Sequence, residues 1–188
     1  MSDSNKQVTV LLQDYHNGNV QAIEKLVPII YDQLKAIAHR FMVKENANHT
    51  LNTTGLVHEA YLRILAQENN NYQNRSHFYA IVATTMRRIL LEVARSKNAV
   101  KRGSGANKIQ LEEHFIISQN DADQIITIDS ALKKLHQIDP RLAQVVELRY
   151  FGGMNVEEIA EAIDCSPSTV KRDWRTAKAW LYQYLKVS

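Results

Sequence analysis

The stretch from 155 to 181, NVEEIAEAIDCSPSTVKRDWRTAKAWL, constrains the fold more than any other part of the chain. Asn155, followed three positions later by Glu158, is typical of a helix start, and an apolar stripe at helical spacing follows it. Where that stripe breaks, Ser166 can cap a second helix, and Pro167 suits its first position because a missing N–H costs nothing there. The sequence therefore predicts two short helices joined by a tight turn.

The second of these helices has two chemically different faces. Its apolar residues recur at spacings of four, three and four, so they share one face, which we expect to pack against the first helix. These residues are Val170, Trp174, Ala177 and Leu181. The remaining face carries several cations and a single acid, Asp173. The cations are Lys171, Arg172, Arg175 and Lys178.

A basic helix face after a tight turn is typical of a DNA-binding helix-turn-helix, in which the second helix lies along phosphates in the major groove. Ser168, Thr169 and Lys171, near the start of that helix, are placed to reach base edges. An ordinary helical hairpin with a solvated basic face is the alternative interpretation. The capped turn favours DNA binding.

The small net charge of the whole chain does not reveal its second basic segment. The whole chain of 188 residues has a net charge of only +3, but the segment from Arg87 to Arg102 contains six basic residues and one acid, Glu92. Two separated basic surfaces indicate an extended polyanion as the partner. With 45% hydrophobic residues, six glycines, three prolines and almost no alternating apolar pattern, the composition favours an all-α protein.

Several classes of function are disfavoured. The single Cys165 excludes an internal disulfide or a cysteine zinc cluster, and no signal peptide or apolar run of transmembrane length is present, so we expect a cytoplasmic protein without membrane contact. His58-Glu59 is the best sign of an enzyme, but Leu62 stands where a zinc protease needs its second histidine. We expect no catalysis, metal, cofactor or small-molecule substrate.

The rest of the chain predicts further helices in two small domains. Apolar spacing predicts helices over 7–15, 20–42 with a kink at Pro28, 56–65 with Thr54 as its N-cap, and 76–96, with a polar loop over 67–75. The glycine-rich NAVKRGSGAN begins a flexible linker, followed by helices over 125–136 and from Asp139-Pro140. We predict domains at 1–98 and 125–188, joined by a linker at 99–124 and able to move independently.

Three segments together resemble the extracytoplasmic-function (group 4) branch of the sigma-70 family, the two-domain initiation factors of bacterial RNA polymerase. LVHEAYLRIL at 56–65 is similar to the family's core-polymerase-binding helix. FYAIVATTMRRILLEVARSK at 78–97 is similar to its helix for the minus-10 element. The stretch at 139–181 is similar to its minus-35-binding domain and is the most specific of the three.

The resemblance implies a role for each group of residues. The minus-35 duplex would be contacted by Ser168, Thr169, Lys171, Arg172, Arg175 and Lys178. The minus-10 element would be contacted by Tyr72, His77, Arg87, Arg88, Arg95 and Lys97, with Tyr72 in the loop that captures an unpaired base. The polymerase clamp would meet Leu56, Glu59 and Arg63. For Tyr72 the alternative is an aromatic side chain folded onto its own domain.

The resemblance also implies partners: core RNA polymerase and promoter DNA. A stand-alone helix-turn-helix regulator, which needs no polymerase, is the alternative. The chain departs from the family just ahead of the polymerase-binding helix, where the family usually carries carboxylates and this chain has Asn52, Thr53, Thr54 and Gly55.

This departure leads to a hypothesis about regulation. A phosphate on threonine would supply the missing negative charge, as in some branches of the family. We therefore expect a Ser/Thr kinase to modify Thr54 first and Thr53 second. The alternative is that Thr54 only caps its helix.

Overall fold

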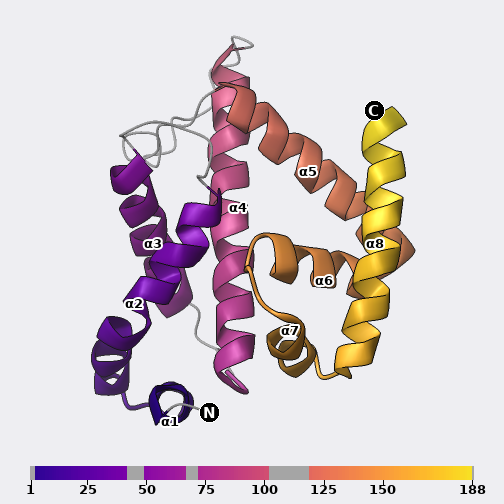
Figure 1. Cartoon of the computed structure of the whole chain (residues 1–188). Helices are drawn as coiled ribbons and strands as arrows, with labels where there is room; N and C mark the ends of the chain where they lie inside the picture. Colours follow the sequence, from indigo (N-terminus) through magenta and orange to yellow (C-terminus); the bar gives the residue numbers. More distant parts are fainter. Residues whose placement is uncertain (1–2, 42–48, 67–71, 102–118, 188) are drawn as a thin grey trace.

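The computed structural model describes residues 3–41, 49–66, 72–101 and 119–187. Within these ranges the chain forms eight α-helices and no strand, as the composition predicted. The helices are α1 (Asp3–His16), α2 (Gln21–Phe41), α3 (His49–Leu65), α4 (Arg75–Lys101), α5 (Gln119–Ile138), α6 (Pro140–Tyr150), α7 (Val156–Ala162) and α8 (Pro167–Val187). Helix α4 stands in the middle, with α1 to α3 on one side and α5 to α8 on the other (Figure 1). We call α1 to α4 the first lobe and α5 to α8 the second lobe.

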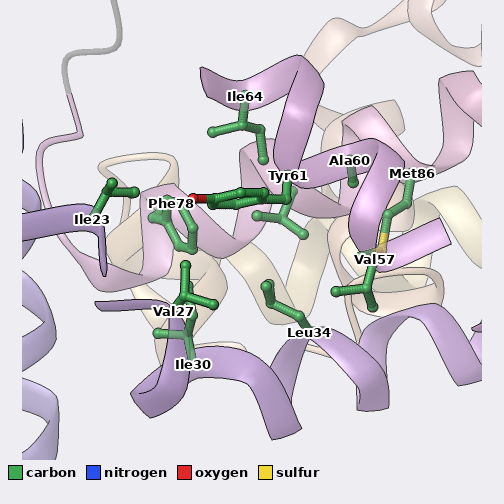
Figure 2. Close-up of a pocket in the computed structure, with 11 residues that line it drawn as sticks. Ile23, Val27, Ile30, Leu34, Val57, Ala60, Tyr61, Ile64, Phe78 and Met86 are labelled. Carbon is green, nitrogen blue, oxygen red and sulfur yellow. The ribbon is translucent and has the colours of Figure 1, made fainter. Parts of the chain in front are cut away.

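The first lobe is built around one apolar core shared by its four helices. Its largest fully buried side chains include Leu12, Leu26, Leu56 and Met86, one from each helix in turn. Figure 2 shows the seam where α2, α3 and α4 meet, with Tyr61 among aliphatic side chains. The cavity in this seam is only about 10 Å³, at the lower limit of the space that one water molecule requires, and its lining is apolar. It is a small packing gap and not a ligand site.

The second lobe has two adjoining apolar clusters. One gathers side chains of α6, α7 and α8 around Leu148 and Ile159, and the other joins α5, α6 and α8 around Leu135 and Ala177. Trp174 is half-buried and packs against both clusters, so it lies at the boundary between them. The predicted inward face of the last helix is therefore confirmed, although Trp174 is not fully enclosed.

Two predicted helix starts in the second lobe, those of α6 and α7, are confirmed by their hydrogen bonds, whereas α5 begins at Gln119, six residues before the predicted start. Asp139 caps α6 and accepts bonds from the N–H groups of Arg141 and Leu142. Asn155 and Glu158 form a complete capping box at the start of α7, with reciprocal bonds of 2.8 and 2.9 Å. Capping satisfies N–H groups that have no partner inside the helix, which explains why these boundaries could be predicted.

Boundaries in the first lobe differ from the prediction. Helix α3 begins at His49, so Thr54 lies inside it and the predicted N-cap at Thr54 is wrong. The sequence between 49 and 54 contains neither proline nor glycine, and threonine and asparagine lower helix propensity without ending a helix. Pro28 lies inside α2 and does not end it, as predicted.

Helical structure extends into both ends of the predicted linker, 99–124. Helix α4 continues to Lys101, and α5 begins at Gln119, while residues 102–118 lie outside the described part of the chain. Ala80 of α4 belongs to an apolar cluster of the second lobe, and Ile125 and Ile126 of α5 pack against the core of the first. The two lobes are thus packed against each other along α4, and the domain boundaries remain a prediction.

Candidate nucleic-acid interface

Helices α7 and α8 are joined by a four-residue turn from Ile163 to Ser166. Asp164 sits in this turn with a φ of 50°, a left-handed conformation that aspartate tolerates better than most residues. Ser166 closes the turn, since its Oγ accepts a hydrogen bond of 3.1 Å from the N–H of Thr169. The geometry matches the two capped helices that the sequence predicts.

The basic face of α8 is open to solvent. Its members Lys171, Arg172, Arg175 and Lys178 are all exposed. Val170 and Ala177, on the opposite face, are fully buried. The hydrophobic effect therefore fixes the rotation of the helix, and the four cations point away from the lobe as a continuous stripe.

Asp173 does not belong to this stripe, so its predicted place among the cations is wrong. It is only 3% exposed, and its carboxylate accepts a hydrogen bond from Nε of Arg141 on α6. Asp173 follows Val170 by three positions, which puts it on the inward face of α8. The outward face consequently carries four exposed cations and no exposed acid, although Arg172 Nε lies 3.5 Å from the buried carboxylate of Asp173. It is a more uniformly cationic surface than the sequence suggested.

The hydroxyl groups at the start of α8 form a small cluster. Ser166 Oγ lies 2.8 Å from both Ser168 Oγ and Thr169 Oγ1. Ser168 is exposed and Thr169 is half-buried, and both lie in the first turn of α8. Ser166 is an additional polar group here, and sequence analysis gave it only a capping role.

A second set of predicted DNA contacts begins with Tyr72, three residues before α4, and continues along α4. Its first two members, Tyr72 and His77, differ in accessibility. Tyr72 is 2% exposed and packs edge-to-face on Phe78 at 5.2 Å between ring centroids. Burial raises the pKa of its hydroxyl, which has no hydrogen-bond partner among the described residues. His77 is half-buried, and its Nδ1 accepts from the N–H of Gln73. The structure therefore shows the alternative for Tyr72, an aromatic side chain folded onto its own lobe.

The arginines along α4 also differ from one another. Arg88 is exposed, and Arg95 is 54% exposed with a 3.2 Å bond to Asp129. Arg87 is enclosed between the lobes, where it pairs with Asp129 and Glu147 at 2.7 Å each. The backbone of Lys97 lies in α4, but its side chain is outside the described residues. Only part of this predicted surface is open in the free chain.

A comparison with known protein families identifies the family of this chain. Residues 5–187 match the family described as ECF sigma factor. The chain belongs to the ECF sigma factor family. It is therefore an RNA polymerase sigma factor, a DNA-binding transcription protein that acts with core RNA polymerase on promoter DNA. No curated protein matched the chain.

In this sigma factor the predicted polymerase-binding helix is α3, and its three predicted contact residues lie in different settings. Leu56 is fully buried in the first core, so its side chain offers no surface to a partner. Arg63 donates two bonds to Glu92, at 2.7 and 2.9 Å, and one to Glu59 at 2.8 Å, and these bonds raise its pKa further. Leu62, which the sequence analysis did not choose, is 47% exposed. Helical spacing alone could have predicted that Leu62 is exposed beside the Glu59–Arg63 ion pair.

Sigma factors in general are not enzymes. Burial raises the pKa of the Cys165 thiol. Within the described residues no group of three or more His, Cys, Asp or Glu is arranged to hold a metal ion. Nor is any helix there both long and apolar enough to cross a lipid bilayer.

Proposed function

We propose that this sigma factor directs promoter-specific initiation by placing α8 on the minus-35 duplex, α4 on the minus-10 element and α3 on the polymerase clamp. The observation that carries the proposal is the acid-free stripe of four exposed cations on α8, directly after a capped turn. Stripes of this kind neutralise phosphates along one strand, and the helix start then reaches base edges.

At the minus-35 element, the proposed role of each residue depends on its position along α8. Arg175 and Lys178 lie further along the helix and would hold phosphates, whereas Ser168, Thr169 and Lys171 in the first turns would meet bases. Arg172 lies between these two groups. Phosphate contacts give affinity and base contacts give sequence preference, so the two groups should be separable by mutation.

At the minus-10 element, Arg88 and Arg95 are the proposed phosphate contacts because they are exposed on α4. Lys97 and Arg87 remain in the proposed set, the latter only when its ion pairs to the second lobe are broken. His77 lies in the first turn of α4, and its Nδ1 accepts a hydrogen bond from the N–H of Gln73, the residue after Tyr72. Base capture by Tyr72 would require its ring to leave the core.

On α3, Glu59 and Leu62 are the proposed polymerase contacts. Glu59 is partly exposed, with 25% of its side chain accessible, and Leu62 lies one turn further along the same face. Arg63 would keep Glu59 oriented through their 2.8 Å ion pair. An apolar residue beside an oriented carboxylate suits a basic partner surface.

We further propose that phosphorylation of Thr54 strengthens polymerase binding. Thr54 is exposed on α3, two turns before Leu62, whereas Thr53 is only 4% exposed. A kinase needs an accessible hydroxyl, so burial favours Thr54 over Thr53. Because Thr54 lies in the second turn of α3, the helix dipole contributes little, and the effect would come from about 1.5 to 2 added negative charges.

A binding measurement tests the phosphorylation proposal. Core polymerase is titrated with unmodified protein, with protein treated with a Ser/Thr kinase, and with kinase-treated Thr54→Ala. Thr127→Ala serves as a control, since Thr127 is an exposed threonine on α5. Tighter binding that Thr54→Ala abolishes and Thr127→Ala retains supports the switch. Equally tight binding by the unmodified protein rules it out.

The proposed function itself is tested by reconstituted transcription. A pool of promoter fragments is transcribed by core polymerase with and without the protein, and initiation sites are mapped. Specific initiation that depends on the protein is expected. A stand-alone regulator would instead shift promoter DNA unaided and leave core polymerase unable to initiate.

A further inference from the structure

Arg63 of α3 is shared by two carboxylates. Its Nη1 and Nη2 donate to Glu92 Oε1 and Oε2 at 2.9 and 2.7 Å, and its Nε donates to Glu59 Oε1 at 2.8 Å. Glu92 belongs to α4 and Glu59 to α3, so the arginine joins the two helices. The pKa of Arg63 is raised mainly by its hydrogen bonding to Glu92. We call these three side chains the α3–α4 triad.

Glu92 lies on the side of α4 that carries two proposed DNA contacts. Arg88 precedes it by four positions and Arg95 follows it by three, and this spacing places all three on one side of a helix. Arg88 is exposed, and the side chain of Arg95 is 54% exposed. Figure 1 shows α3 on one side of α4 and α5 on the other, and Glu92 is bonded to α3. Glu92 is therefore an acid within the proposed minus-10 surface.

The charge of Glu92 is close enough to affect phosphate binding. Side chains three or four positions apart on a helix are separated by about 5 to 6 Å, which is shorter than the Debye length of about 8 Å at physiological salt. An unpaired carboxylate at this position would repel a phosphate bound by Arg88 or Arg95. The side chain of Glu92 is 42% exposed, so a ligand on this surface can approach it.

The geometry of the ion pair suits Arg63 to neutralise that charge. Two N–H donors on the two oxygens of one carboxylate form a bidentate pair, which fixes the orientation of both groups. An ion pair whose partners are 29% and 42% exposed contributes little to folding, because solvent screens it. Its effect on the charge of the surface is separate from this small contribution. Glu59 competes for the same guanidinium, since the triad has two carboxylates and one cation.

We propose that Arg63 is a positioning residue for minus-10 binding: it cancels the charge of Glu92 on the DNA-facing side of α4, and Glu59 limits how completely it does so. This role of Arg63 rests on the proposed function of α4. Glu59 is also a proposed polymerase contact, so a polymerase cation that pairs with Glu59 leaves Arg63 to Glu92. Residues of the polymerase-binding helix thereby set the charge of the minus-10 surface.

Four variants distinguish this role from a purely structural one. Glu92→Gln and Glu59→Gln each remove one acid of the triad, so both should bind DNA about twofold to fivefold more tightly than the parent. Arg63→Gln leaves Glu92 without its counter-ion and should bind about twofold to fivefold more weakly. The double substitution of Arg63→Gln with Glu92→Gln removes both charges and should restore the affinity of the parent. An ion pair that only joins α3 to α4 predicts weaker binding for Glu92→Gln, which is the opposite sign.

Binding of the full-length proteins to a labelled single-stranded oligonucleotide of mixed sequence is measured by fluorescence anisotropy over a salt series. Far-ultraviolet circular dichroism verifies the helix content of each variant. Glu24→Gln and Lys25→Gln on α2, both exposed and outside the triad, measure the effect of one lost charge elsewhere on the chain. The changes caused by the triad variants should exceed those of the controls and should shrink as salt screens the charges.

The outcomes separate the role of Arg63 from the role of α4. Arg88→Ala and Arg95→Ala should weaken binding, because they remove proposed phosphate contacts. If they do, weaker binding by Glu92→Gln, no rescue in the double variant, or changes no larger than those of the controls would overturn the role of Arg63 alone. If Arg63→Gln does not fold, the sign of the effect of Glu92→Gln decides. Binding that neither Arg88→Ala nor Arg95→Ala alters would contradict the proposed function of α4, and the role of Arg63 with it.

Discussion

Arg141 of α6 and Asp173 of α8 form an ion pair in which one partner is buried and the other is not. The carboxylate side chain of Asp173 is 5% exposed, whereas that of Arg141 is 45% exposed. Hydrogen bonding to Asp173 raises the pKa of Arg141 further, so the arginine stays charged. This pair joins α8 to α6 and, together with a 3.5 Å pair between Asp173 and Arg172, holds the only acid of α8 in a buried position.

Because the two partners differ in burial, we expect their mutations to lower the stability of the protein by different amounts. Arg141→Ala leaves a buried carboxylate without its main partner, whereas Asp173→Ala leaves an arginine that solvent can reach. We expect Arg141→Ala to lower the melting temperature more than Asp173→Ala does, as measured by circular dichroism. Lys134→Ala, an exposed cation on α5, is the control for a lost charge. An equal loss in both variants would contradict the buried position of Asp173.

Variants of Tyr72 test whether its side chain packs in the core or is available to capture a base. Its hydroxyl is buried without a hydrogen-bond partner in the described part of the chain, so Tyr72→Phe should be neutral or stabilise by up to about 1 kcal/mol. Tyr72→Ala should lower the free energy of unfolding by about 3 kcal/mol. Denaturant unfolding measures both. A loss of stability in Tyr72→Phe would show that the hydroxyl has a partner.

Trp174 provides a test of the second-lobe core. The ring packs against both apolar clusters, and the guanidinium of Arg149 lies 5.4 Å from its centroid. We expect Trp174→Ala to lower the free energy of unfolding by about 3 kcal/mol, the lower part of the usual range, because the ring is only half-buried. Trp180→Ala should cost less, since Trp180 stacks on Tyr184 near the end of the chain. A larger loss for Trp180 would contradict this assignment of the core.

The sequence predicted the second lobe better than the first for a physical reason. Asn155, Glu158 and Pro167 act locally, through hydrogen bonds or dihedral angles within one turn, and those starts were confirmed. The start of α3 has no such local signal, so the N-cap was placed wrongly at Thr54. Local chemistry is visible in a sequence, whereas a helix end that depends on packing is not.

The same distinction holds for the candidate site. The cations of α8 could be predicted because 3.6-residue periodicity separates them from Val170 and Ala177. The enclosure of Arg87 could not, because Asp129 and Glu147 lie 42 and 60 positions away in the sequence. Contacts of that separation depend on how the lobes pack, which no pattern within one helix records.

The basic stripe of α8 predicts a salt-dependent loss of binding. Arg175→Ala and Lys178→Ala each remove one proposed phosphate contact, so each should reduce the slope of log K against log salt by roughly 0.9 on duplex DNA. The loss of affinity should be largest at low salt and similar across sequences, because phosphates carry no sequence information. Fluorescence anisotropy over a salt series measures this, with Lys25→Ala on α2 as a control of equal charge. Affinities equal to the parent at low salt would remove these two residues from the interface, whereas a loss confined to one DNA sequence would assign them to base contacts instead.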